Sequence, residues 1–307
     1  MPLITAPASE LTPTLRGLHL FHFDGAPCAQ RVRFALGEKG LARGREVTFD
    51  AADDGALMGE EGRWVSRTVS LPRKAHLSEA YAKIHPDMVV PALVHDGRLY
   101  LESMDIITYL DETFAGPQLV PQGSEAKAEA MALVEEAKLL HVSLRYVTFR
   151  WGLGRLAMLN GKEQKRLQAL AAKGEDKENL VSFYRAYSGR TIEQSVFDDH
   201  LKRLYTAFTH VEARLSDGRD YLMGGQVSIA DAFWAMKILR LIETGYPISR
   251  VHPAVYTWYQ RMAQRPAFQQ EVMGKNRVNY RFFRAKSIIE NALGLGLNSA
   301  FDRLAMA

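Results

Sequence analysis

The sequence predicts an α/β region followed by an all-α region, and three observations support this fold class. Residues 18–50 place two short β-rich runs on either side of an amphipathic segment, the β-α-β order of a parallel crossover. After residue 124, apolar positions recur at helical spacing through most of the chain. Between the two regions, residues 116–124 contain prolines and glycines without helical periodicity, which predicts a short linker.

The first elements follow from their local sequence. LHLFHF at 18–23 predicts a strand, and the DGAP turn leads into a helix, CAQRVRFALGEKG, which Gly40 ends. REVTFD at 45–50 predicts a second strand. Residues 51–82 break this pattern, and we expect a loop-rich insertion there with one irregular helix.

The segment MVVPALVHDGRLYLESMDIITYL is the most informative part of the chain. An apolar run enters Val90-Pro91, and ALV and LYLE flank a tight His-Asp-Gly-Arg turn, which predicts a β-hairpin. Proline cannot donate a ladder hydrogen bond, so Pro91 suits the entrance of a strand, where a cis peptide bond is also a recurrent feature. Glu102 and Ser103 then stand at a strand-to-helix junction, with Ser103 expected as the N-cap. A free backbone edge beside a helix N-terminus suits a small peptide that carries a carboxylate.

Composition excludes several classes of protein. The chain has 307 residues, 47% of them hydrophobic, which is enough for a sizeable core. A single cysteine, Cys28, excludes an intramolecular disulfide and a cysteine-based zinc cluster. A net charge of +4 is too small to indicate nucleic-acid binding. No apolar run approaches a membrane span and residues 1–16 resemble a flexible arm without a secretory signal, so we expect a cytoplasmic protein that contacts no membrane and holds no metal.

The second region reads as successive helices. The pattern runs from Glu125 to about Leu159, continues over 192–216, and ends in PAVYTWYQRMAQRP at 253–266. Ser228 and Asp231 have the spacing of a capping box in front of AFWAMKILRLI. A basic and aromatic tail follows, which is either a solvated amphipathic face, a lid or a subunit contact; its residues are Lys275, Arg277, Tyr280, Arg281, Phe282, Phe283, Arg284 and Lys286.

Three motifs, in order, resemble the cytosolic glutathione transferase family. They are P-C-x-x-R-V-R at 27–33, V-P-A-L…E-S-M-D-I-I-T-Y-L at 90–110, and S-I-A-D-A-F at 228–233. The resemblance implies an N-terminal thioredoxin-like domain over 17–115, with the insertion at 51–82. It also implies a C-terminal helical bundle domain over 125–307, which includes a C-terminal extension.

The resemblance also implies a glutathione site. In that family, backbone groups at the position of Val90 pair with the cysteinyl part of glutathione, and the proline matching Pro91 is cis. The residues matching Glu102 and Ser103 hold the γ-glutamyl end. These residue types suit the task, because the charged ends of a tripeptide need an acid, a hydroxyl and free N–H groups.

The chain departs from the family where the glutathione thiolate would be activated. Ala26 and Gly25 stand where relatives carry Cys or Ser, and neither has a side-chain donor. Cys28 is a weak catalytic candidate, since a thiol at a helix N-terminus can be reactive, but a cysteine there often packs into the core. The alternative that we favour is a thiolate held by backbone N–H groups at the helix start; further residues near this site are Asp24, Gln30 and His22. Met88 also replaces the usual glycine of the preceding loop.

A second substrate is expected beside the helical region. Tyr146, Phe149, Arg150 and Trp151 are the candidate pocket residues. An aromatic cluster is more often core, but an arginine among aromatic rings also suits an aromatic, anionic substrate.

The function we expect is attack of the glutathione thiolate on a small hydrophobic, in particular aromatic, electrophile. The unusual ends and the missing Ser or Cys resemble bacterial dehalogenases and enzymes that cleave lignin β-aryl ethers. Two alternatives stay open: a thiol-disulfide transferase that uses Cys28, and a non-catalytic glutathione-binding subunit of a heterodimer. We expect a dimer, formed either with a second copy or with a related chain.

Overall fold

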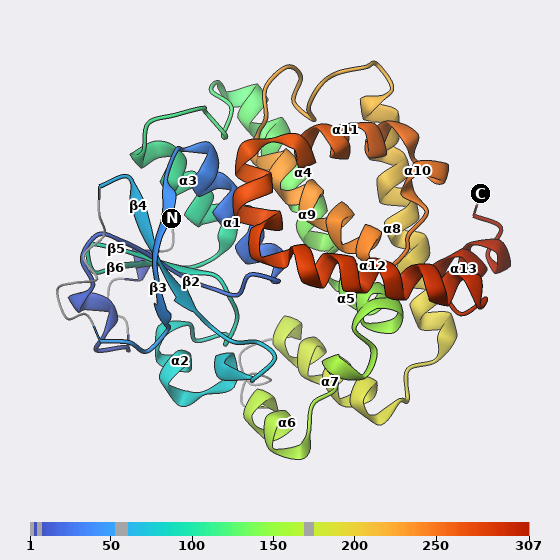
Figure 1. Cartoon of the computed structure of the whole chain (residues 1–307), viewed down its shortest axis with the longest axis horizontal. Coiled ribbons are helices and arrows are strands. Elements are labelled where there is room, and N and C mark those ends of the chain that lie inside the picture. The colour runs from blue at the N-terminus through green and yellow to red at the C-terminus, as the bar shows by residue number, and fades with distance from the viewer. Residues whose placement is uncertain (1–2, 5–7, 53–60, 169–174, 307) are drawn as a thin grey trace. The chain divides into compact units, whose positions relative to one another are not determined.

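The computed structural model describes residues 3–4, 8–52, 61–168 and 175–306. It divides into two compact units, which are coloured along the chain in Figure 1. The first unit consists of Met1–Pro117, Leu159–Arg185 and Gln270–Val272; the second consists of Gln118–Met158, Ala186–Gln269 and Met273–Ala307.

The first unit is built on a six-stranded mixed sheet, in the order β1-β6-β5-β2-β4-β3. β2 and β3 run parallel to β4, whereas β5 and β6 are antiparallel to their neighbours. The strands are β1 (Leu3–Ile4), β2 (Leu18–His22), β3 (Ala42–Thr48), β4 (Arg63–Thr68), β5 (Ala92–His95) and β6 (Arg98–Tyr100). The α-helices of its N-terminal part are α1 (Pro27–Glu38), α2 (Glu79–Ile84) and α3 (Ser103–Thr113).

Short sequence patterns predicted most of these strands and helices at the correct positions. The β-α-β start is confirmed, although the second strand begins at Ala42, three residues before REVTFD. The hairpin between β5 and β6 turns through Asp96 and Gly97, whose φ angles of 48° and 76° are both positive. Two positive φ angles define the type I′ turn, whose twist matches the flanking strands.

The expectation of a loop-rich stretch over 51–82 was wrong in one respect, because this stretch contains β4 in the interior of the sheet. Its sequence, RWVSRT, lacks the polar alternation or apolar run of a typical strand. Ser66 and Arg67 are nevertheless buried, since both have distant partners. The His22 ring nitrogen Nε2 lies 2.8 Å from Ser66 Oγ, and Arg67 Nε donates to His19 Nδ1 at 3.1 Å.

The second unit is helical, which together with the mixed sheet confirms the predicted fold class. The pattern expected as one segment from Glu125 to Leu159 is divided in the structure. Its parts are α4 (Ser124–Leu139), α5 (His141–Thr148), a π-helical turn η3 (Phe149–Leu153) and a 3-10 turn η4 (Gly154–Ala157). The later helices are α8 (Gln194–Leu215), α9 (Ile229–Glu243), α10 (Ile248–Val251), α11 (Pro253–Gln264), α12 (Arg277–Ala292) and α13 (Leu297–Arg303).

Two segments from the helical half of the sequence belong to the first unit. One is Leu159–Arg185, with α6 (Gly161–Gln168) and the first part of α7 (Glu175–Gly189). Leu159, Leu167 and Val181 form a small buried cluster with Leu77 of the N-terminal part. The other is Gln270–Val272, so the compact units do not follow the boundary expected at residue 125.

The expected capping box is present at the start of α9. Asp231 Oδ2 accepts hydrogen bonds from the backbone N–H and the hydroxyl of Ser228, at 2.8 and 2.7 Å. Asp231 Oδ1 accepts from the Leu222 N–H and from Trp258 Nε1, both at 2.9 Å. The carboxylate is fully buried, so it joins the loop before α9 to α11 inside the second unit.

Candidate functional site

The Val90-Pro91 peptide bond is cis and stands directly before β5. Within the part of the chain that the structure describes, neither the N–H nor the C=O of Val90 takes part in a hydrogen bond. A buried residue with two unused backbone groups is rare, because such groups normally find partners. Val90 therefore presents one donor and one acceptor for an extended ligand.

Glu102 and Ser103 follow β6 at the end of the hairpin where this proline enters β5. The last pair of the antiparallel β5–β6 ladder at that end is Leu93 with Tyr100, so Val90 and Pro91 come just before it on one side, and Glu102 and Ser103 just after it on the other. The carboxylate of Glu102 and the hydroxyl of Ser103 form no hydrogen bond or ion pair within the described residues. Glu102 is exposed, whereas Ser103 is only 6% exposed.

The expectation that Ser103 caps α3 was wrong. Glu102 occupies the N-cap position without a side-chain cap, and Ser103 is the first helical residue. Glu102 has φ 61° and ψ 119°, a conformation that is costly for a residue with a side chain. Because no local capping bond is formed, the first N–H groups of α3 and the Ser103 hydroxyl remain available to an anion.

The start of α1 lies at the same end of the sheet. Phe21 of β2 faces Ala92 of β5, so the same register sets the residues after β2 next to Val90 and Pro91. A Cβ added to Gly25 would lie 2.9 Å from the Phe23 ring, so a side chain there would require Phe23 to move. α1 then begins at Pro27, with Ala26 as a cap that makes no side-chain hydrogen bond.

Groups around the first turn of α1 remain available for a ligand. The N–H groups of Cys28 and Ala29 have no partner among the described residues. Gln30 is 1% exposed, and its Oε1 is a buried acceptor without a hydrogen-bond partner. Such an atom is costly unless a ligand or water satisfies it.

Cys28 is partly buried at the second position of α1. One turn further on, Arg31 Nη2 donates to the Cys28 sulfur at 2.8 Å. The contact gives the thiol a cationic neighbour at a helix N-terminus, a setting typical of reactive cysteines. The sequence identified Cys28 as a candidate but did not identify this partner.

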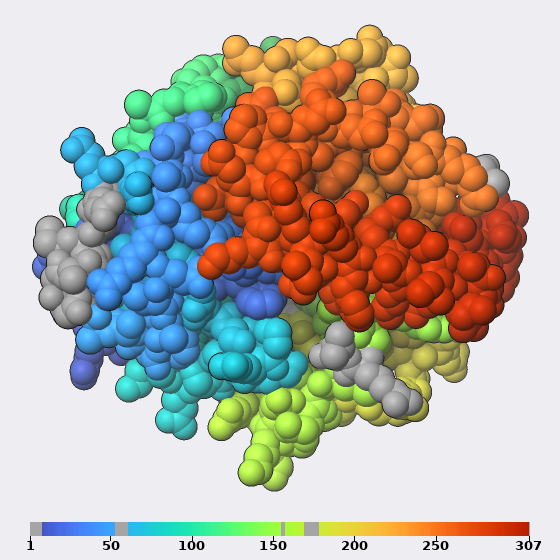
Figure 2. All heavy atoms as spheres, viewed as in Figure 1, coloured from blue at the N-terminus to red at the C-terminus, as the bar shows by residue number. Residues whose placement is uncertain are grey.

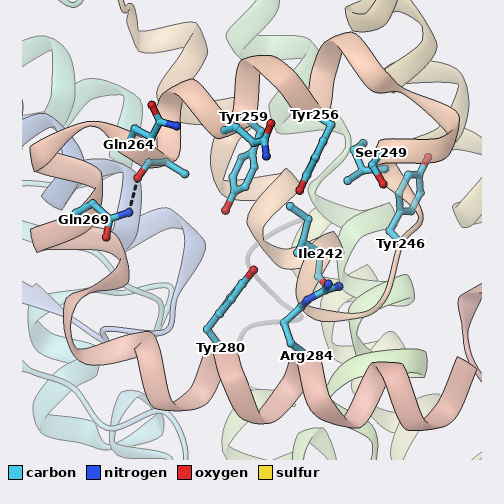
Figure 3. A pocket seen from close by; sticks show the side chains of 12 residues that line it. Ile242, Tyr246, Ser249, Tyr256, Tyr259, Gln264, Gln269, Tyr280 and Arg284 are labelled. Atoms are coloured by element: carbon cyan, nitrogen blue, oxygen red, sulfur yellow. Dashed lines mark hydrogen bonds between the residues drawn. The ribbon is translucent and has the colours of Figure 1, made fainter.

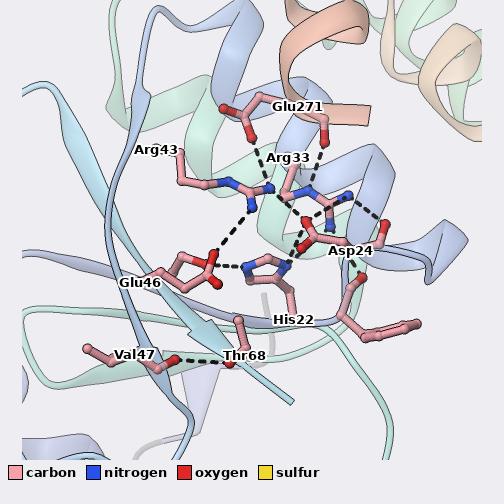
Figure 4. A network of polar contacts seen from close by, with 10 residues as sticks. His22, Asp24, Arg33, Arg43, Glu46, Val47, Thr68 and Glu271 are labelled. Atoms are coloured by element: carbon pink, nitrogen blue, oxygen red, sulfur yellow. Dashed lines mark hydrogen bonds and ion pairs between the residues drawn. The ribbon is translucent and has the colours of Figure 1, made fainter. Parts of the chain in front are cut away.

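His22 and Asp24 are part of a buried polar network in the first unit, shown in Figure 4. His22 is fully buried between Ser66 and Arg33, whose Nη1 lies 3.2 Å from His22 Nδ1. The Asp24 carboxylate accepts from Arg43 at 2.8 Å and lies 3.7 Å from Arg33. The two side chains that we expected near the thiolate are thus engaged by arginines.

Arg33 is the centre of this network and was not identified from the sequence as a buried residue. It donates to the carbonyls of Glu271, Asp24 and Phe23 at 2.9, 2.8 and 3.3 Å. Burial lowers the pKa of Arg33 to about 10, so it remains charged at neutral pH. The bond to Glu271 fixes the segment Gln270–Val272 to the first unit.

The four expected pocket residues form an aromatic cluster in the second unit. Tyr146 stacks on His200 with ring centroids 3.9 Å apart, and Phe149 meets Tyr187 edge-on at 5.3 Å. Trp151 is buried, while the exposed Arg150 lies over its ring at 5.5 Å and donates to Gln194. The rings of the cluster therefore pack on their neighbours, and Arg150 remains at its surface.

A separate cavity of about 270 Å³ lies between α9, α11 and α12 of the second unit. Figure 3 shows Tyr256 and Tyr259 pointing into it from α11 and Tyr280 from α12. Arg284 borders the same space and donates to the carbonyl of Ile242 at 3.1 Å. Its wall contains none of the four expected pocket residues.

Two general features are absent from the described residues. They contain no group of three or more His, Cys, Asp or Glu side chains arranged to bind a metal ion. Within those same ranges, no helix combines the length and the apolar character needed to cross a membrane.

The sequence matches two descriptions of one family. Residues 20–118 match "Glutathione S-transferase, N-terminal domain", and residues 160–266 match "Glutathione S-transferase, C-terminal domain". The two matches cover most of the chain. They leave the stretch after residue 266, including α12 and α13, outside the family description.

Individual relatives are distant. The chain is 26% identical to glutathione S-transferase theta-1 of Mus musculus over 196 residues, 64% of this chain and 70% of the relative. It is 26% identical to 2,5-dichlorohydroquinone reductive dechlorinase of Sphingobium indicum, over 83% and 82% of the two chains. It is 27% identical to protein LigF of Sphingobium sp. strain SYK-6, over 63% and 77%. The crystal structure of that β-etherase LigF has a TM-score of 0.66 at 21% identity, covering 83% of this chain and 98% of LigF, which supports the fold.

Proposed function

The chain belongs to the glutathione S-transferase family, and from this premise we propose that it binds glutathione at the cis-proline end of its sheet and transfers the thiol to a hydrophobic, aromatic electrophile. The observation that carries the proposal is the set of unsatisfied polar groups there. The Val90 backbone, the Glu102 carboxylate and the Ser103 hydroxyl have no partners in the described chain, although Val90 and Ser103 are buried.

These groups match the chemistry of glutathione. The Ser103 hydroxyl and the first N–H groups of α3 would donate to the γ-glutamyl carboxylate. Glu102 would pair with the adjacent ammonium, and the Val90 N–H and C=O would pair with the cysteinyl backbone as in strand addition. The thiol would then face the start of α1. Gly25 and Ala26 have no side chain that could donate a hydrogen bond to the sulfur, so the backbone N–H groups of Cys28 and Ala29 would be the donors.

The proposed reaction is a direct substitution. The thiol loses its proton to solvent, the sulfur forms a bond to carbon, and the carbon–leaving group bond breaks. The leaving group departs with the electron pair as a halide or a phenolate, and a phenolate then takes up a proton. Similarity to β-etherase LigF favours an aryl ether as the electrophile. We retain the cluster of Tyr146, Phe149, Arg150 and Trp151 as its binding site, with Arg150 available to an anionic group.

A substrate panel tests this function. The protein is incubated with glutathione and an aryl halide, an alkyl halide or a β-aryl ether, and mass spectrometry follows the thioether and the leaving group. We expect one class to give a glutathione adduct with equal release of halide or phenol. Calorimetric binding of glutathione without turnover of any class would instead indicate a binding subunit. Failure to bind glutathione would contradict the whole proposal.

A second candidate function rests on the 2.8 Å contact between Arg31 and the Cys28 sulfur. In a thiol-disulfide transferase, the Cys28 thiolate would attack the glutathione sulfur of a mixed disulfide, form a Cys28–glutathione disulfide and release the substrate thiol. A reduced glutathione would then attack this disulfide, which restores the Cys28 thiolate and releases oxidised glutathione. Cys28→Ser is expected to leave substitution activity within about threefold of wild type, since backbone N–H groups hold the glutathione sulfur. Loss of disulfide reduction with intact substitution would show a second activity, whereas loss of substitution would place Cys28 in the main reaction.

A further inference from the structure

The cavity between α9, α11 and α12 belongs to neither of the sites proposed above. All the residues that line it are in the second unit, and its volume of about 270 Å³ is close to the lower limit of about 300 Å³ for pockets that hold small molecules. The helices α11 and α12 that border it form the orange-to-red surface in Figure 2. α12 lies beyond residue 266, where the match to the family description ends.

Helical spacing brings four polar side chains together in this cavity. On α11, Tyr256 and Tyr259 are three residues apart, so both lie on one face of the helix. On α12, Tyr280 and Arg284 are four residues apart and share a face for the same reason. Figure 3 shows the three rings and the guanidinium approaching one space from two facing helices. The cavity thus presents three phenol hydroxyls and one cation to a ligand.

The phenol hydroxyls are the feature that points to a ligand. Within the described residues, the side chains of Tyr256, Tyr259 and Tyr280 form no hydrogen bond. Tyr259 is only 6% exposed, and a buried polar group without a partner is rare because it costs free energy. Burial raises the pKa of Tyr259 and of Tyr280, so both hydroxyls keep their protons at neutral pH. They can therefore donate to a ligand that carries acceptor atoms.

Arg284 supplies the charge of the cavity. Its Nη1 donates to the Ile242 carbonyl at 3.1 Å, which fixes the guanidinium in the wall. Its Nε and Nη2 form no hydrogen bond or ion pair within the described residues. These two groups share one edge of the planar guanidinium, and that edge matches the two oxygens of a carboxylate. Glu243 of α9 also acts on the tyrosines, but Arg240 compensates its charge at 2.5 Å.

We propose that this cavity binds a small aromatic carboxylate. The carboxylate would accept hydrogen bonds from the free edge of Arg284 and from the hydroxyls of Tyr259 and Tyr280. Its ring would pack between the tyrosine rings and the apolar wall to which Ile242 and Tyr246 contribute. Such a ligand satisfies at once the polar groups that have no partner in the described chain.

The wall favours this class of ligand over two other anions. Inorganic phosphate would use the cation and the hydroxyls but would leave Ile242, Ile248 and the tyrosine faces without contacts. The chain of a long fatty acid needs more apolar volume than a cavity of about 270 Å³ provides. A planar acid with one ring meets the cation, the hydroxyls and the rings together.

Calorimetry with benzoate tests the class of ligand on the whole protein without glutathione. We expect a dissociation constant of about 1 mM or lower. Benzyl alcohol lacks the charge and should bind about tenfold more weakly, as should inorganic phosphate. Cyclohexanecarboxylate lacks the aromatic ring and should bind about threefold more weakly. Absence of benzoate binding, or equal binding of any of these probes, would overturn the proposal.

Single substitutions test the position of the site. Tyr259→Phe removes only the buried hydroxyl and is expected to weaken benzoate binding about tenfold. Its Tm should equal or exceed that of wild type, because this hydroxyl has no partner in the described chain. Arg284→Gln is expected to weaken binding at least as much, whereas Arg281→Gln, an exposed change on the same helix, should bind like wild type. Unchanged affinity of Tyr259→Phe with a lower Tm would give the hydroxyl a role in folding and overturn the proposal.

One further variant separates this cavity from the proposed electrophile site. Arg150→Gln changes the aromatic cluster, where an aromatic anion is also expected, and should leave the affinity for benzoate unchanged. Loss of benzoate binding in Arg150→Gln but not in Arg284→Gln would place the probe at that cluster and overturn the proposal. A crystal soaked with para-bromobenzoate should show the bromine between α11 and α12. None of these readouts requires glutathione, so their failure would leave the proposed function standing.

Discussion

Replacing Ser103 by alanine is expected to raise the dissociation constant of glutathione about 10- to 100-fold, as measured by calorimetry. A hydrogen bond to a charged group is worth about 1.5–3 kcal/mol, and Ser103 is a residue that is only 6% exposed, so little water compensates for the loss of its hydroxyl. Glu102→Gln is expected to have an effect of similar size, because it removes the charge that would pair with the glutathione ammonium.

Matched substitutions separate binding from folding in this experiment. Ser124 is the first residue of α4 just as Ser103 is the first residue of α3, so Ser124→Ala repeats the change at an exposed helix start. Glu112→Gln repeats the charge removal at an exposed position of α3 itself. Both controls should bind glutathione like wild type. Equal affinity of Ser103→Ala and Ser124→Ala would place the ligand elsewhere.

The parts of the fold that the sequence predicted are those with local causes. Asp96 and Gly97 adopt positive φ angles, which an Asp-Gly pair accepts readily. A stretch of about ten residues was therefore enough to predict the hairpin. Ser228 and Asp231 are three residues apart, and their capping box is equally local. The proposed glutathione site was likewise predicted from one short stretch, which holds Val90, Pro91, Glu102 and Ser103.

The parts that the sequence did not predict depend on distant partners. The sequence of β4 looks unlike a strand because it contains Arg67, a residue that is seldom buried. Its burial is made acceptable by partners outside β4, since His19 Nδ1 and the carbonyls of Phe49 and Ala51 accept its hydrogen bonds. Arg33 is stabilised by the carbonyl of Glu271, 238 residues further along the chain. No periodicity within a short window contains such information. Likewise, the positive φ of Glu102 results from the junction between β6 and α3 and not from its residue type.

Asp231→Ala is expected to have the largest effect on stability, lowering the free energy of unfolding by about 3–5 kcal/mol. The carboxylate is fully buried and accepts four hydrogen bonds, from the N–H and the hydroxyl of Ser228, the Leu222 N–H and Trp258 Nε1. Truncation leaves four buried donors without an acceptor and removes the tie between the α9 cap and α11. Urea unfolding followed by circular dichroism, at one fixed protein concentration, measures the loss.

Two further variants show whether the geometry of the carboxylate or only its charge matters. Asp231→Asn keeps the side-chain volume and one of the two acceptor oxygens. Its amide NH₂ replaces the other oxygen and faces two N–H or O–H donors that it cannot accept from. We therefore expect a smaller loss in the free energy of unfolding, of about 1–3 kcal/mol. Asp217 is an exposed carboxylate paired with Arg219, and Asp217→Ala should unfold at the same urea concentration as wild type. If Asp231→Ala instead loses less than about 1 kcal/mol, water satisfies the freed donors, and the capping box is not what holds α9 in place.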